Sequence, residues 1–83
     1  MDSKRKAMQL KRSENGAVEI ISGKRTVITI KKTSDGVALI DNIQRMSALY
    51  CVPQAQKNSV IESSIRRLQA AYGTFTEAPQ EGN

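Results

Sequence analysis

The stretch Arg25-Thr26-Val27-Ile28-Thr29-Ile30-Lys31-Lys32 is the strongest strand signal in the 83-residue sequence. β-Branched side chains fill five successive positions, from Thr26 to Ile30, and such side chains favour extended backbone. A lone strand leaves its backbone N–H and C=O groups unpaired, and its edges seek a partner. Because the chain from there to Tyr72 is typical of helix, we expect two copies of the chain to pair strand to strand.

One alternative keeps the pairing within a single chain. Residues 17–21, Ala-Val-Glu-Ile-Ile, form a short apolar patch, and Ser22-Gly23-Lys24 can turn that patch back against the main strand as a hairpin. Such a hairpin would supply the missing strand and remove the reason for a dimer. We favour the other interpretation, an extended segment that covers part of the surface.

Length and residue types favour an oligomer built from one small domain. A chain of this size has a thin core, and comparable domains are often stapled by disulfides or metals, or are oligomeric. Cys51 is the sole cysteine and histidine is absent, so the chain has neither an intrachain disulfide nor a Cys/His zinc cluster. We expect no metal and no cofactor.

The net charge of +5 and the pI of about 9.7 favour a polyanionic partner, most often nucleic acid. No apolar run approaches the ~20 residues that a membrane-spanning helix needs. The basic N-terminal residues are not followed by the apolar segment of a secretory signal. The sequence therefore predicts a cytoplasmic protein without membrane contact.

Two helices are expected after the strand. Asp35 is a good N-cap residue, and apolar side chains recur at spacings of three and four from there to Tyr50, which predicts a first helix. Pro53 ends it, because proline lacks the backbone N–H. A second helix should begin near Lys57 and end at Gly73, a natural C′ residue. The predicted class is mostly α with one short strand, in the order β-α-α.

A basic arm, a strand, a capped helix, a break and a second helix follow one another in the order of a ribbon-helix-helix domain. The matching residues are the strand, the helix from Val37 and the segment Lys57-Asn58-Ser59-Val60-Ile61 that opens the second helix. On these residues the chain resembles the ribbon-helix-helix superfamily of DNA-binding proteins. The resemblance implies an interlocked homodimer, with an intermolecular two-stranded antiparallel ribbon and a four-helix core. The expected segments are a flexible basic arm (1–23), the dimerisation and DNA-binding domain (24–72) and a disordered polar tail (73–83).

The resemblance also implies a function: sequence-specific binding of double-stranded DNA, with the ribbon in the major groove and further assembly of dimers on DNA. A transcriptional repressor is the leading interpretation. A plasmid partition or conjugation accessory protein, or an antitoxin, is the alternative. No pair of acids has catalytic spacing and Cys51 has no His partner, so we expect no enzyme activity.

Alternation along the strand separates a core face, with Thr26, Ile28 and Ile30, from an outward face. Base contacts are expected from the outward side chains of Arg25, Val27, Thr29 and Lys31. Phosphate contacts are expected at the N-terminus of the second helix and beside the strand, from Lys24, Lys57, Asn58 and Ser59. The expected dimer core holds Ile28, Ile30, Val37, Ile40, Ile43, Ile61, Ile65 and Leu68.

Overall fold

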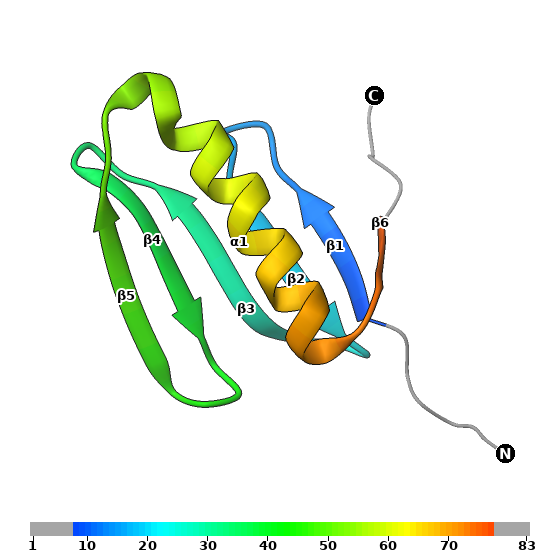
Figure 1. The fold of residues 1–83 in the computed structure, drawn as a ribbon. Coiled ribbons are helices and arrows are strands. Elements are labelled where there is room, and N and C mark those ends of the chain that lie inside the picture. Colours follow the sequence, from blue (N-terminus) through cyan, green and yellow to red (C-terminus); the bar gives the residue numbers. More distant parts are fainter. Residues whose placement is uncertain (1–7, 78–83) are drawn as a thin grey trace, which may run out of the picture.

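The computed structural model describes residues 8–77, and in that range a six-stranded sheet is covered on one face by a helix (Figure 1). The strands are β1 (Met8–Arg12), β2 (Val18–Ser22), β3 (Arg25–Lys32), β4 (Gly36–Asp41), β5 (Met46–Cys51) and β6 (Phe75–Glu77). A 3₁₀ turn, η1 (Gln54–Gln56), leads into the helix α1 (Lys57–Tyr72). The strand order is β5-β4-β3-β2-β1-β6. Strands β1 to β5 are antiparallel neighbours, and β6 runs parallel to β1.

The prediction of a mostly α chain is wrong, and so is the ribbon shared between two chains. The decisive stretch is indeed a strand, β3, but it lies inside the sheet between β2 and β4. Its backbone groups are therefore paired within one chain, and β3 needs no second copy. The hairpin alternative is confirmed, since β2 pairs with β3 across the turn at Gly23.

The predicted segment boundaries change as well. Residues 8–22, expected to belong to the arm, form β1, β2 and the turn between them, and Phe75–Glu77 of the expected tail forms β6. Residues 1–7 and 78–83 lie outside the described part of the chain.

The predicted first helix is also wrong, because residues 36–51 form β4, a turn and β5. Asp41 ends β4, and its Oδ1 accepts hydrogen bonds from the backbone N–H groups of Ile43 and Gln44, each at 3.0 Å. This local bonding holds the backbone in a turn and competes with helix. Without the first helix the four-helix core cannot form.

The predicted second helix is confirmed. It runs from Lys57 to Tyr72 and ends at Gly73, whose φ of 105° suits a residue without a side chain. Ile61 and Ile65, one turn apart, are buried against the sheet, and this apolar stripe is the signal that located the helix.

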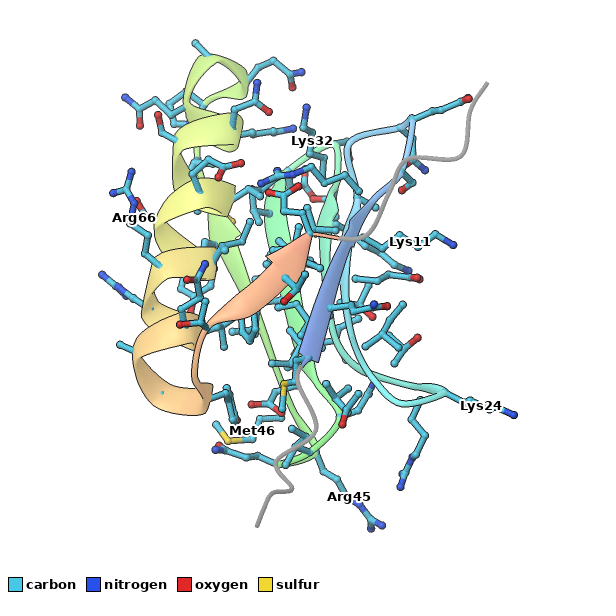
Figure 2. The ribbon with its side chains drawn as sticks, turned by 90° about the vertical axis from the view of Figure 1, so that its right-hand side faces the viewer. Lys11, Lys24, Lys32, Arg45, Met46 and Arg66 are labelled. Atoms are coloured by element: carbon cyan, nitrogen blue, oxygen red, sulfur yellow. The ribbon has the colours of Figure 1, made fainter. Side chains whose placement is uncertain are left out.

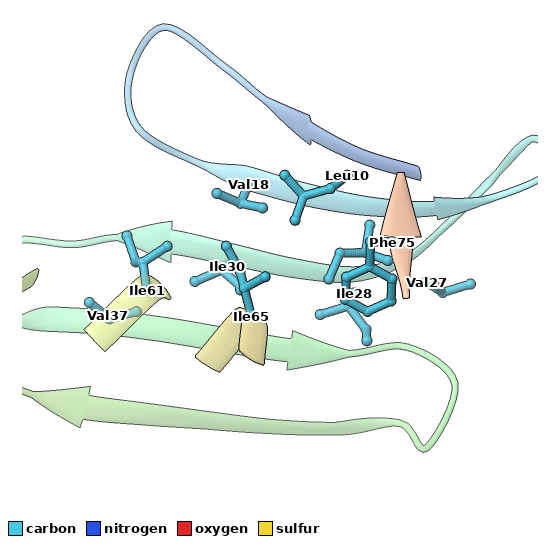
Figure 3. Packing of buried hydrophobic residues seen from close by; sticks show 10 residues of the cluster. Leu10, Val18, Val27, Ile28, Ile30, Val37, Ile61, Ile65 and Phe75 are labelled. Atoms are coloured by element: carbon cyan, nitrogen blue, oxygen red, sulfur yellow. The ribbon is translucent and has the colours of Figure 1, made fainter. Parts of the chain in front are cut away.

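The core lies between α1 and the covered face of the sheet (Figure 3). Its buried residues are Leu10, Val18, Ile20, Val27, Ile28, Ile30, Val37, Ile61, Ile65 and Phe75. Five residues of the expected dimer core therefore lie in the core of one chain: Ile28, Ile30, Val37, Ile61 and Ile65. Leu68 is partly buried against this core. Ile40 lies on the other face of the sheet, and Ile43, in the β4–β5 turn, is 46% exposed.

A β-bulge reverses the predicted alternation at the start of β3. Ile20 pairs with Ile28, but the next residue, Ile21, pairs with Thr26, so Val27 is the extra residue. Val27 is consequently buried, at 9% exposure, and Thr26 is exposed. The prediction that Thr26 faces the core is therefore wrong, whereas the predicted burial of Ile28 is confirmed.

Candidate nucleic-acid interface

The β2–β3 hairpin extends beyond the neighbouring part of the sheet. The β3–β4 pairing ends at Asp41, whereas the β2–β3 pairing continues to Ser22 opposite Arg25. Gly23 has a φ of 68° and Lys24 does not have a positive φ, which is the sign pattern of a type II′ turn. On its other side the hairpin is paired with β1 as far as Ile21 opposite Gln9, so the part that projects past both neighbours is the Ser22–Arg25 pair and the turn that carries Lys24 (Figure 2).

The β4–β5 turn, residues 42–45, lies at the same end of the sheet and is bonded to the hairpin. Asn42 makes two hydrogen bonds to β3. Its backbone N–H donates to the carbonyl of Val27 at 2.7 Å, and its side-chain Nδ2 donates to the carbonyl of Thr26 at 3.2 Å. Arg45 follows in the left-handed region, with a φ of 58°. These bonds fix the two loops relative to each other.

The C-terminal end of α1 supports the β4–β5 turn from behind. The Tyr72 hydroxyl donates to Oδ2 of Asp41 at 2.8 Å and accepts from Nε2 of Gln44 at 3.1 Å. The hydrogen bond to Asp41, then burial, then the negative charge of Asp41 raise the pKa of Tyr72 above its ordinary value of 10.0, and the Gln44 contact opposes them. The turn that presents Arg45 is thus anchored to the helix.

The basic side chains at this end form the candidate interface, which we call the basic tip: Lys24, Arg25 and Arg45. All three are exposed. The acidic residue beside them, Asp41, is 8% exposed, and its oxygens face Tyr72 and the turn N–H groups. The other acidic residues of the described range lie in other elements: Glu14, Glu19, Asp35, Glu62 and Glu77. The two loops at this end of the sheet therefore present three exposed cations, and the one carboxylate of the described range that lies beside these loops is buried.

The structure does not bring the four predicted base-contacting residues together. Arg25 belongs to the basic tip, and Val27 is buried. Thr29 and Lys31 lie on the sheet face that points away from α1, which we call the open face. There Thr29 is half-buried between Glu19 and Ile40 on the neighbouring strands.

The predicted phosphate-contacting residues are separated too. Lys24 belongs to the basic tip. Lys57 is only 3% exposed, and its ammonium donates to the carbonyl of Thr33 and lies 3.5 Å from that of Ser34. It neutralises carbonyl dipoles at the β3–β4 turn and does not face solvent. Asn58 and Ser59 are exposed at the start of α1.

Sequence reasoning missed Arg45, because its place depends on β4 and β5 forming a hairpin. The available signal was the Asp41-Asn42 pair inside the predicted helix, since Asp and Asn favour turns. No family model, curated protein or solved structure matches the chain. Within residues 8–77 there is no cluster of His, Cys, Asp and Glu that could hold a metal ion. No helix in the same range is long and apolar enough to cross a membrane.

Proposed function

We propose that this protein binds double-stranded DNA through the basic tip. The observation that carries the proposal is the placement of Lys24, Arg25 and Arg45, exposed on two mutually hydrogen-bonded loops whose neighbouring carboxylate is buried. Duplex DNA presents one negative charge per ~1.7 Å of its axis, and cations held together at one surface release its counterions. A two-stranded β-projection also fits the major groove, which is about 12 Å wide.

The aromatic residues favour a duplex over a single strand. Proteins that bind single strands usually stack bases on exposed aromatic rings. The chain has three aromatic residues: Phe75 is buried, Tyr72 is bonded to Asp41, and Tyr50 lies on the edge strand β5. Tyr72 lies behind the β4–β5 turn with its hydroxyl bonded to Asp41 and Gln44, and none of the three lies on the open face, so phosphate contacts are the interaction that the basic tip offers.

The proposal concerns DNA binding and not a regulatory role. Contacts to phosphates position a protein on DNA but carry no sequence information directly. The repressor interpretation rests on the resemblance to ribbon-helix-helix proteins, and the fold lacks their architecture. We therefore do not extend the proposal to a repressor, a partition or conjugation protein, or an antitoxin.

The test compares two triple variants of equal charge by fluorescence anisotropy on a labelled 20-base-pair duplex. One variant is K24A/R25A/R45A, which removes the basic tip. The other is K11A/K32A/R66A, which removes three exposed cations elsewhere (Figure 2). Three phosphate contacts correspond to a slope of about −2.7 in log K against log salt, or about a 40-fold loss of affinity between 50 and 200 mM salt.

We expect the basic-tip variant to lose this part of the salt slope, and the control variant to keep it. Single-stranded DNA and duplex RNA of the same length serve as competitors. Equal losses in the two variants would mean that only the net charge matters. Tighter binding to the single strand would also overturn the proposal.

A further inference from the structure

Strand β5 is an exposed edge without the usual protection. All six of its residues are exposed, and β4 is its single neighbour in the described sheet. Met46 is 60% exposed, Leu49 51% and Tyr50 43%. Natural edge strands are normally kept from pairing by charged side chains, proline, a bulge or short length. β5 carries none of these devices.

The opposite edge of the sheet shows the contrast. β6 has only three residues, and it carries Glu77. The guanidinium of Arg12 on β1 bonds Glu77 at 3.3 Å and Glu62 on α1 at 2.8 Å, so charged groups cover this side of the sheet. One edge is thus short and charged, and the other is long, uncharged and apolar.

The helix does not cover β5, and a groove runs between them. Its volume is about 460 Å³. The apolar part of its lining is Tyr50, Val52 and Val60, and the polar part, on the helix side, is Gln56, Ser59, Ser63, Ser64 and Arg67. The β4–β5 register places Tyr50 on the covered side of the sheet, opposite Val37, so the ring of Tyr50 forms one wall of this groove. An occupant that paired with β5 would therefore place its own side chains against the groove.

We propose that the occupant is β5 of a second copy of this chain, paired antiparallel to form a homodimer with a continuous sheet. Each copy has a net charge of +5, so two copies repel on balance and approach at least cost where both surfaces carry no charged side chain. The longest run without a charged residue in the sequence is 46–56, which is β5 and the segment after it. The backbone of β5 then gains the hydrogen-bond partners that it lacks on its outer side.

The symmetry of such a pair fixes its register. Residues directly opposite each other in an antiparallel pair point to the same face of the sheet. The two-fold axis therefore runs between two copies of one residue, which lie opposite each other, and not between two different residues. An axis at Ala48 puts the smallest side chain of β5 at the centre. It also places Met46 of each copy opposite Tyr50 of the partner subunit, and both of these pairs lie on the face of the sheet where the grooves are. Two apolar pairs then close the two grooves, which favours this register.

The first test is sedimentation equilibrium of the full chain at micromolar concentration. We expect twice the chain mass of 9.1 kDa for the natural sequence. Ala48→Lys should give the monomer mass, because two ammonium groups would meet at the axis. Ala48 is exposed, so the substitution leaves the fold intact, which circular dichroism can check. Gln9→Lys, which adds the same charge on β1, should remain a dimer.

The second test locates the axis by cysteine crosslinking in a Cys51→Ser background. Opposite residues have Cα atoms about 4.5–5.5 Å apart, within the range of a disulfide. Under diamide oxidation Ala48→Cys should form a crosslinked dimer, and Leu49→Cys should not. The reverse result would overturn the register. A natural chain that stays monomeric at 100 μM would overturn the dimer, and neither outcome depends on whether the basic tip binds DNA.

Discussion

Two lysines show how the surroundings of one residue type decide its role. Lys24 is exposed at the end of a hairpin, whereas Lys57 is buried and donates to the carbonyl of Thr33. Both were predicted to contact phosphates, because a sequence shows the charge but not the direction of the side chain. Lys24 was within reach of prediction, since the Ser22-Gly23-Lys24 turn signal is local. The inward direction of Lys57 depends on its contact with the β3–β4 turn, so the sequence alone could not predict it.

The substitution Lys57→Met separates these roles. It keeps the apolar stem but removes the ammonium, which leaves the partly buried Thr33 carbonyl without this donor. We expect a loss of about 1–3 kcal/mol in the free energy of unfolding, measured by urea denaturation. Affinity for the DNA duplex should stay the same in the folded variant. A normal stability combined with weaker DNA binding would show instead that Lys57 contacts phosphate.

Tyr72 makes stability depend on pH at the alkaline end. Its pKa is raised in the folded protein, chiefly by the hydrogen bond to Asp41, so the folded state holds the proton more tightly than the unfolded state does. The stabilising contribution is complete below the ordinary pKa of 10.0 and is lost as the pH rises from there through the folded-state pKa.

We expect the difference in unfolding free energy between the natural protein and Tyr72→Phe to be constant from pH 7 to 9. The difference should shrink above pH 10, because the natural protein then loses the Asp41 hydrogen bond. Urea denaturation across this range measures it. The comparison cancels contributions from every group that both proteins share. A difference that stays constant up to pH 11 would exclude this role of Tyr72.

At the scale of elements, local signals located β3 and α1 and failed for the other strands. Five consecutive β-branched residues specify β3 regardless of context, and the apolar stripe of α1 has a single interpretation. β1 has five residues that mix charged with apolar side chains, so its sequence resembles a polar arm, whereas β2 is the short apolar patch of the hairpin alternative. β1 pairs with β2 and with the distant β6, so its extended state depends on residues outside its own sequence.

The prediction of a helix at β4 and β5 was wrong because their apolar residues fit both the helical period and the strand period. In the sheet, Val37 is buried and Ala38 faces the other side, and the turn at Asp41 restarts the pattern. Gly36 explains part of the error. Glycine only weakens a helix, so it did not rule out the predicted first turn, but in the structure a Cβ at Gly36 would lie 2.0 Å from the carbonyl oxygen of Tyr50. Its role is to let β5 approach, which only the pairing shows.

At the scale of the molecule, one thin core supports a sheet with two unlike edges. Small domains bury a modest share of their surface, so their folded state is marginal unless something else supports it. The predicted dimer rested on the unpaired edges of a lone strand, supported by the small size of the chain, and its contact was expected at β3. The fold pairs β3 within the chain and leaves β5 as the unpaired edge. A second copy is therefore expected to pair with β5 and not with β3.

The proposed dimer predicts that thermal stability depends on protein concentration. Association favours the folded state by mass action, so the unfolding midpoint should rise on the order of 5 °C between 1 and 100 μM. Ala48→Lys should show no such rise and should unfold near the midpoint that the natural protein approaches on dilution. Gln9→Lys should follow the natural protein. Differential scanning calorimetry at several concentrations measures all three. A midpoint of the natural protein that is independent of concentration would mean that β5 stays unpaired and that the single core suffices alone.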